Sequence, residues 1–130
     1  MTIDKEKLKT KFDKSIVLDE NLNKYSWFNI GGPAEIFFRP RNESELVKFL
    51  EKNEFKKENL NILGAGSNTL IRDGGIKGIT IKLSSNFSHC KLLDKNIIEV
   101  GAATLDKNIS NFAIKKSISG LEFLSCIPGT

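Results

Sequence analysis

Residues 60–68, Leu-Asn-Ile-Leu-Gly-Ala-Gly-Ser-Asn, run from an apolar strand pattern directly into a tight turn with two glycines. Gly64 and Gly66 allow positive φ and let another group lie against the backbone. Consecutive N–H groups in such a turn form a concave site for an anion, typically a phosphate, and Ser67 and Asn68 can add neutral side-chain hydrogen bonds. The stretch predicts a phosphate-binding loop without a fixed cation, as suits the pyrophosphate of a dinucleotide. On this short motif alone, an ordinary strand-to-turn connection is the alternative.

Two better-known phosphate loops do not match this stretch. A P-loop requires a lysine directly after its second glycine, and no lysine stands there. The dinucleotide fingerprint G-x-G-x-x-G requires glycine or alanine where Thr69 stands, then a long helix and, about 20 residues on, an acidic residue. Instead, Asp73-Gly74-Gly75 makes a turn, and residues 83–89 contain no carboxylate. The sequence therefore excludes a Rossmann unit.

The composition is that of an ordinary globular domain. The chain has 130 residues, of which 39% are hydrophobic and 28% charged, enough for one domain with a real core. No apolar run approaches the roughly 20 residues of a membrane span, and residues 1–14 are charged throughout, unlike a signal peptide. We therefore expect a cytoplasmic protein without a membrane partner. Cys90 and Cys126 lack C-x-x-C spacing and His89 has no second ligand pair, so we expect neither a disulfide nor a metal site.

The net charge of +4 invites a nucleic-acid interpretation. The lysines are spread evenly along the chain, however, and there is no basic stripe with interleaved aromatic residues and no known nucleic-acid motif. We expect a solvated basic surface, a mild attraction for an anionic ligand and no nucleic-acid partner.

The first half of the sequence alternates helix and strand patterns. Residues 3–12 predict a short amphipathic helix, and residues 34–39 and 60–63 predict strands. A helix that connects two strands favours a parallel pair. The glycine-containing loop would then lie at the carboxyl end of the second strand, where α/β sheets usually bind ligands.

The helix between these strands has a clear start signal. Asn42 is a natural N-cap, and Glu45 stands three residues later, as in a capping box. The helix is expected to run to about residue 52 and to bury the apolar side chains Leu46, Val47, Phe49 and Leu50.

The second half predicts another strand over residues 78–83 and a hairpin of residues 90–93 and 97–100. Thr104 is a plausible N-cap for a helix over residues 105–116, whose start is a second candidate anion site. Its inward side chains are expected to be Ile109, Phe112 and Ala113.

The last four residues have the pattern of the middle of a loop, and nothing follows to cover the apolar residues 121–124. We therefore expect the sequence to be a fragment of a longer protein. The alternative is a frayed tail on a complete small domain.

Several separated segments stand out together: residues 27–35 (Trp-Phe-Asn-Ile-Gly-Gly-Pro-Ala-Glu), 63–68 (Leu-Gly-Ala-Gly-Ser-Asn), 72–78 (Arg-Asp-Gly-Gly-Ile-Lys-Gly), 120–123 (Gly-Leu-Glu-Phe) and 127–130 (Ile-Pro-Gly-Thr). In order and spacing, across nearly the whole chain, this set resembles the UDP-N-acetylenolpyruvoylglucosamine reductases, the flavoenzymes of peptidoglycan precursor synthesis. Each motif is weak alone, and the set is specific.

The resemblance implies an α+β fold, the FAD-binding domain of the vanillyl-alcohol-oxidase type, in which two α/β subdomains hold an extended FAD. Residues 1–23 would be an N-terminal helical extension, residues 24–83 the first subdomain and residues 84–130 the start of a second, truncated one. FAD would be held non-covalently, because His89 does not match a covalent attachment motif and is better interpreted as an exposed loop histidine.

The resemblance also implies which residues bind the cofactor. The pyrophosphate would lie on Gly64, Ala65, Gly66, Ser67 and Asn68. The flavin end would lie against Ile127, Pro128 and Gly129.

In the family, NADPH reduces the flavin, which passes hydride to the enol ether of a UDP-sugar and gives UDP-N-acetylmuramate. The residues that assist this step in the family, an Arg, a Glu and a Ser, correspond to positions beyond 130. No catalytic residue is therefore expected here, Arg72 and Glu122 are interpreted as surface or local structural residues, and residues 1–130 alone are expected to lack reductase activity. The alternatives are another FAD-dependent oxidase or dehydrogenase of the same fold, or a non-catalytic remnant.

Overall fold

A four-stranded sheet organises the first part of the computed structural model, which describes residues 4–51 and 60–130. In chain order the strands are β1 (Ile16–Asn21), β2 (Pro33–Phe38), β3 (Leu60–Ile62) and β4 (Ile76–Ile81). Across the sheet the order is β1-β2-β4-β3, with β2 and β3 both parallel to β4, and β1 antiparallel to β2. The carboxyl ends of β2, β4 and β3 therefore meet at one edge of the sheet.

Two features of this sheet differ from the sequence prediction. The strands predicted over residues 34–39 and 60–63 are present and run parallel, but β4 lies between them and pairs with both. Residues 16–21 form β1, so the prediction that residues 1–23 are a helical extension is wrong for this stretch. β1 alternates between more and less buried residues, a period-two pattern that the sequence analysis misses.

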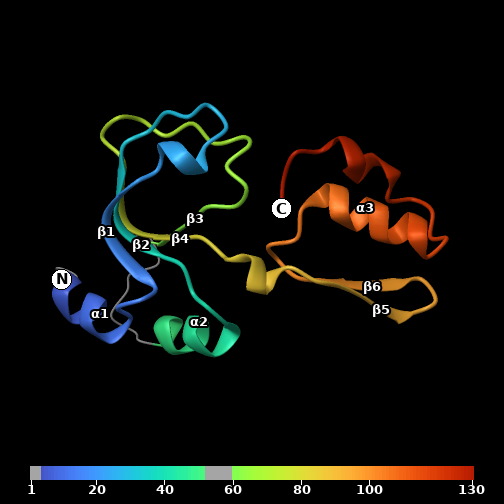
Figure 1. The fold of residues 1–130 in the computed structure, drawn as a ribbon, viewed down its shortest axis with the longest axis horizontal. Helices are drawn as coiled ribbons and strands as arrows, with labels where there is room; N and C mark the ends of the chain where they lie inside the picture. The colour runs from blue at the N-terminus through green and yellow to red at the C-terminus, as the bar shows by residue number, and fades with distance from the viewer. Residues whose placement is uncertain (1–3, 52–59) are drawn as a thin grey trace.

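Two helices cover one face of this sheet (Figure 1), α1 (Lys5–Lys11) and α2 (Glu43–Leu50). Phe12 follows α1 directly, and its ring packs edge-on against Phe38 and Phe49 with centroids 5.8 Å and 5.4 Å away. Phe38 and Phe49 stack at 4.0 Å. Aromatic pairs in such geometries stabilise a core beyond the area they bury, so this triad holds both helices to the sheet.

The apolar side chains of α2 do not all face this core. Phe49 is fully buried and Leu46 packs against the cluster, as predicted. Val47 and Leu50 are 49% and 46% exposed, contrary to the prediction. The buried face of α2 therefore includes fewer of its apolar side chains than the sequence analysis predicted.

Two loops, residues 22–33 and 63–75, cover the opposite face of the sheet. The ring of Tyr25, the last residue of the 3-10 turn η1 (Asn23–Tyr25), lies 4.9 Å from that of Phe37. The buried apolar side chains on this face are Leu22, Ala34, Phe37, Leu63 and Ile71.

These two loops contact one another through their backbones. The N–H of Gly32 donates to the carbonyl of Arg72 at 2.9 Å. Gly75 has a φ of +70°, and a Cβ there would lie 1.9 Å from the carbonyl oxygen of Pro33. Only glycine satisfies both the conformation and the approach, so the turn after the second loop is fixed against the start of β2.

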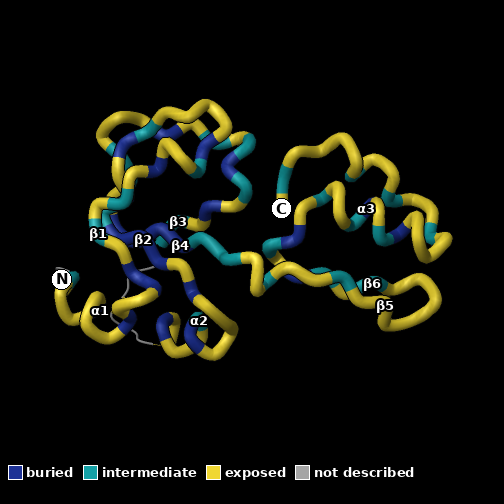
Figure 2. Tube along the Cα trace, viewed as in Figure 1, coloured by how far each residue is buried: buried dark blue, intermediate teal, exposed yellow. Residues whose placement is uncertain are grey.

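The elements from residue 90 onward form a second lobe beside the first (Figure 1). β5 (Cys90–Asp94) pairs antiparallel with β6 (Ile97–Val100), and α3 (Asp106–Lys115) packs against the 3-10 turn η4 (Glu122–Cys126). The predicted hairpin and helix are thus confirmed. Figure 2 shows that buried residues gather in the first lobe, whereas the second is mostly exposed.

The start of α3 differs from the prediction. Leu105, not Thr104, occupies the N-cap position, and its side chain makes no capping hydrogen bond. The hydroxyl of Thr104 instead accepts from the N–H of His89 at 3.0 Å and donates to its carbonyl at 3.1 Å. A hydroxyl can serve in both ways, and here it ties the helix start to the hairpin.

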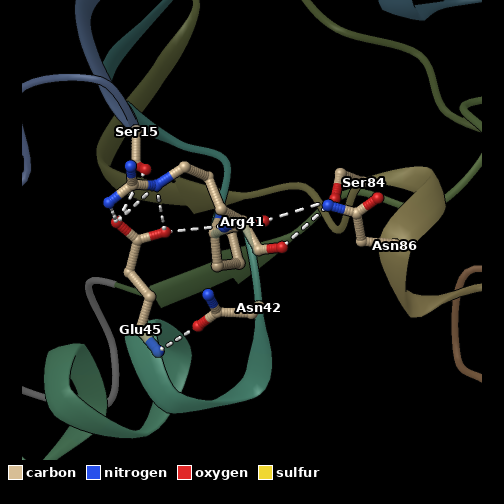
Figure 3. Close-up of polar contacts among 7 residues, drawn as sticks. Ser15, Arg41, Asn42, Glu45, Ser84 and Asn86 are labelled. Atoms are coloured by element: carbon tan, nitrogen blue, oxygen red, sulfur yellow. Dashed lines mark hydrogen bonds and ion pairs between the residues drawn. The ribbon is translucent and has the colours of Figure 1, made fainter.

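Glu45 is a buried carboxylate at the start of α2 (Figure 3). Asn42 Oδ1 accepts from the N–H of Glu45 at 2.9 Å, which confirms the predicted cap. The carboxylate does not return to Asn42 as in a capping box. It accepts from the N–H of Arg41 at 2.6 Å, from the hydroxyl of Ser15 at 2.8 Å and from the Arg41 guanidinium at 3.0 Å.

The backbone beside this carboxylate also holds the linker between the lobes (Figure 3). The amide of Asn86, in the 3-10 turn η3 (Ser85–Phe87), donates to the carbonyl of Arg41 at 2.9 Å. The hydroxyl of Ser84 donates to the carbonyl of Pro40 at 3.3 Å. The segment that leads into the second lobe is therefore fastened to the turn before α2.

The aromatic triad generates a first prediction. Phe49→Ala is expected to lower the free energy of unfolding by about 3–5 kcal/mol, because it removes a fully buried ring and leaves a cavity. Urea denaturation followed by circular dichroism measures this. Val47→Ala, on the exposed side of the same helix, is the matched control and should change stability by less than about 0.5 kcal/mol. Equal effects of the two substitutions would contradict the packing described.

Glu45 generates a prediction about pH. Burial works to raise the pKa of Glu45, but hydrogen bonds from Arg41 and Ser15 outweigh it and hold the pKa below the ordinary 4.5. A lowered folded-state pKa contributes stability that is fully present above the ordinary pKa and is lost as the pH falls from that value through the lowered folded-state pKa. Glu45→Gln should therefore destabilise by about 1–2 kcal/mol near pH 7, and this difference should shrink near pH 3.5.

Urea denaturation at both pH values measures this difference. The control is Glu51→Gln, at the exposed end of the same helix, which should change stability little at either pH. A Glu45→Gln effect that is the same at both pH values would show that the carboxylate charge does not matter.

Candidate functional site

The loop after β3 is held against the aromatic segment that precedes β2. Gly66 has a φ of +73°, and a Cβ there would lie 1.9 Å from the carbonyl oxygen of Tyr25. The N–H of Trp27 donates to the carbonyl of Gly66 at 3.2 Å. The sequence therefore needs glycine at this position for both its conformation and its contact, and the contact fixes which way the loop turns.

Several backbone N–H groups of this loop are unpaired among the described residues. Among the described residues, the N–H groups of Ala65, Gly66, Ser67 and Asn68 have no hydrogen-bond acceptor. Buried or half-buried donors ordinarily find a partner in protein or water, and Gly66 is buried. Consecutive unpaired N–H groups on a glycine turn fit the phosphate groups of a dinucleotide cofactor.

The structure brings the second predicted loop, residues 127–130, to the first. The hydroxyl of Ser67 donates to the carbonyl of Pro128, a contact between residues 61 positions apart. A Cβ on Gly64 would lie 3.0 Å from Thr130 Oγ1. Figure 1 shows the end of the chain returning from the second lobe toward the first. The two segments predicted to bind one cofactor therefore lie against one another.

Two adjoining hollows lie at this junction. One, of about 400 Å³, is lined by Gly64, Lys82 and residues 102–103, among others. The other, of about 390 Å³, is lined by Ser67 and residues 125–129, among others. Volumes of this order are typical of small-molecule sites.

The walls of these hollows are apolar and exposed. Trp27 and Leu105 line both, and Ile62, the last residue of β3, lines the first. Their exposed fractions are 66% for Trp27, 47% for Leu105 and 74% for Ile62. Large apolar side chains that gather at a concave surface favour binding of a ligand with flat apolar groups. The sequence analysis did not select Ile62 or Leu105, because a strand or helix pattern assigns apolar residues to the core.

Lys82 is a functional candidate that the sequence analysis missed. It follows β4 directly, and its ammonium donates to the carbonyl of Gly64. Burial, followed by the nearby charge of Arg39, lowers the pKa of Lys82. The phosphate-type loop therefore has a cation beside it, contrary to the prediction of a loop without one. The sequence does show a lysine at the carboxyl end of a predicted strand. Its position beside the loop follows only from the pairing of β4 with β3, which the sequence does not show.

The remaining candidates lie outside the glycine turn of residues 64–68. His89 is about half exposed on the hairpin side, with Nε2 3.4 Å from the carboxylate of Glu99. The carbonyl of Arg72 accepts from the N–H groups of Gly32 and Gly75, each at 2.9 Å, and Glu122 accepts from the N–H of Gly120 at 2.8 Å. Both residues therefore take part in backbone hydrogen bonding, Arg72 through its carbonyl and Glu122 through its carboxylate.

At the start of α3, the second candidate anion site, a backbone N–H group already has an acceptor within the chain. The N–H of Asp106 donates to the carbonyl of Gly129 at 3.1 Å. A Cβ on Gly129 would lie 2.7 Å from the carboxylate of Asp106. An acidic side chain and an occupied donor do not favour an anion there.

In the part of the chain that the structure describes, no helix is long and apolar enough to cross a membrane.

Comparisons with known proteins agree with this geometry. A family model described as an FAD-binding domain matches residues 34–130. A UDP-N-acetylenolpyruvoylglucosamine reductase of Pelagibacter ubique (strain HTCC1062) is 48% identical over 124 residues, which cover 95% of this chain and 41% of that protein. A reductase of the same name from Rickettsia canadensis (strain McKiel) is 47% identical over 112 residues, 86% of this chain and 37% of that protein. The chain thus spans about two fifths of the length of these relatives.

A solved structure is similar as well. The crystal structure of the UDP-N-acetylenolpyruvylglucosamine reductase of Thermus caldophilus superposes with a TM-score of 0.65 at 32% identity, and the match covers 88% of this chain and 38% of that one. The predicted α+β fold of the FAD-binding type is confirmed by this match and by the family model. The chain therefore belongs to the FAD-binding-domain family, and its similarity to the UDP-N-acetylenolpyruvoylglucosamine reductases, inferred from separated motifs, is confirmed.

Proposed function

We propose that this chain binds FAD non-covalently at the junction of its two lobes. The pyrophosphate would accept hydrogen bonds from the N–H groups of residues 65–68, and Gly64 would leave room for it. The flavin end would lie against Ile127, Pro128 and Gly129. The observation that carries this proposal is the contact of Ser67 with Pro128, which joins two segments 61 positions apart at one concave surface.

The chemistry of the bound group would come from its flavin, which accepts and passes on hydride. The protein contributes binding, orientation and an apolar surrounding. Trp27, Ile62 and Leu105 supply exposed apolar surface for the flat rings. The open N–H groups supply hydrogen bonds to the phosphates.

We further propose that the chain is the FAD-binding portion of an NADPH-dependent reductase. The reaction would convert UDP-N-acetylenolpyruvoylglucosamine to UDP-N-acetylmuramate, a step of peptidoglycan synthesis, as the names of the relatives and the motif resemblance suggest. Because a nucleotide sugar and NADPH are intracellular metabolites, we place this reaction in the cytoplasm. The UDP-sugar and its reduction would require residues other than 1–130.

The division of the FAD-binding domain at residues 83 and 84 is part of this proposal. β4 ends at Ile81 and η3 begins at Ser85, so the proposed boundary falls in the linker between the lobes. The first subdomain, proposed as residues 24–83, would exclude β1, although β1 pairs with β2 along the edge of the same sheet.

Titration of the purified chain with FAD tests the proposal directly. We expect saturable quenching of flavin fluorescence, release of FAD by denaturation, and competition by ADP, which carries the same pyrophosphate. The absence of FAD binding would overturn the proposed function. A steeply salt-dependent affinity for DNA or RNA, without FAD binding, would favour a nucleic-acid-binding domain instead.

A glycine substitution tests the placement of the pyrophosphate loop. Gly66→Ala is expected to displace the loop and destabilise the chain by about 1–3 kcal/mol or more, because its φ is positive and a Cβ would meet the Tyr25 carbonyl. FAD affinity should fall by at least about tenfold, equivalent to about 1.4 kcal/mol.

Gly74→Ala is the matched control. A Cβ at Gly74 would have no heavy atom within 4 Å, so both stability and FAD affinity should be retained. Binding of FAD by Gly66→Ala as tightly as by the unaltered chain would exclude the loop as the phosphate site.

A further inference from the structure

Lys82 is placed at the phosphate-type loop by the strand order of the sheet. β4 lies beside β3 and parallel to it, with Ile81 paired to Ile62. The residue after β4 therefore stands next to the loop that follows β3. The ammonium of Lys82 contacts the carbonyl of Gly64, and the side chain lines the same hollow as Gly64 and Ala65.

The charge of this ammonium is not compensated within the described part of the chain. No ion pair joins Lys82 to a carboxylate there, and the Glu20 carboxylate, which bonds to the hydroxyl of the neighbouring Tyr25 at 2.9 Å, is paired with Lys24 at 2.7 Å. The ammonium lies 5.9 Å from the ring centroid of Tyr25. Arg39, which follows β2, adds a second positive charge nearby.

A half-buried cation beside another cation costs free energy unless an anion accompanies it. Burial and Arg39 accordingly lower the pKa of Lys82. A single carbonyl dipole is a weak partner for an ammonium, whereas a phosphate oxygen forms a short, charge-assisted hydrogen bond. The site therefore has a cation that a bound pyrophosphate would satisfy.

We infer that the ammonium of Lys82 binds the pyrophosphate of the cofactor directly, as the charged partner of the neutral N–H groups of residues 65–68. This inference rests on the proposed binding of FAD. The N–H groups define where the phosphates lie, and Lys82 adds attraction for their negative charge. The loop after β3 and the lysine that follows the neighbouring strand β4 would thus bind the same pyrophosphate.

The test compares FAD affinity and stability for Lys82→Met, Lys82→Arg and the unaltered chain. Flavin fluorescence quenching gives the dissociation constant, and urea denaturation without FAD gives the free energy of unfolding. Lys82→Met should weaken FAD binding about 10- to 100-fold, the range for a lost charge-assisted hydrogen bond, without lowering stability, because it removes an uncompensated charge. Lys82→Arg should restore most of the affinity.

Lys77→Met is the matched control, since Lys77 lies in β4 at the end opposite to Lys82 and is exposed. It should leave FAD binding unchanged. Equal FAD binding by Lys82→Met and the unaltered chain would overturn the role of Lys82 while leaving the proposed function intact. A parallel loss of stability and affinity that arginine fails to restore would show that Lys82 only braces the Gly64 carbonyl. Failure of the unaltered chain to bind FAD would overturn the proposed function itself.

Discussion

The candidate site depends on the close backbone contact between two loops, residues 22–33 and 63–75. Gly66 lies against the carbonyl of Tyr25 and Gly75 against that of Pro33, one contact near each end of the aromatic segment. Any larger side chain at either glycine would separate the loops. These contacts hold the turn in which the N–H groups of residues 65–68 have no acceptor among the described residues, and Trp27 lines the hollow beside it. The apolar cluster beneath them keeps the arrangement rigid.

Local signals predicted most of the elements, and long-range pairing explains what they missed. The Asn42 cap, the hairpin of β5 and β6 and helix α3 depend on residues close in sequence, and all three were predicted. The insertion of β4 between β2 and β3 depends on contacts that no local pattern encodes. The same holds for Glu45, whose position matches a capping box but whose carboxylate bonds to Arg41 and Ser15 instead.

The residues of the candidate site also fall into those that were predicted from the sequence and those that were missed. The first of its two loops was predicted from a glycine pattern and the second only from the resemblance to a known family, and the structure brings the two together. Lys82 was missed because a lysine in an alternating strand is ordinarily a solvent-facing residue. Its significance follows only from the strand order, which puts the end of β4 beside Gly64. Thr104 was assigned to a helix cap on local grounds, whereas its hydroxyl bonds to His89.

The contact of Ser67 with Pro128 also has a consequence for how the chain assembles. It closes a segment of 61 positions that includes the whole hairpin and α3. The entropy lost on closing such a loop grows only slowly with its length, but it is not offset until both lobes are formed. The first lobe has an aromatic core of its own, while the second lobe buries few residues. We therefore expect the junction to order late in folding and to open early, and a ligand that bridges it would hold the two ends of that loop together.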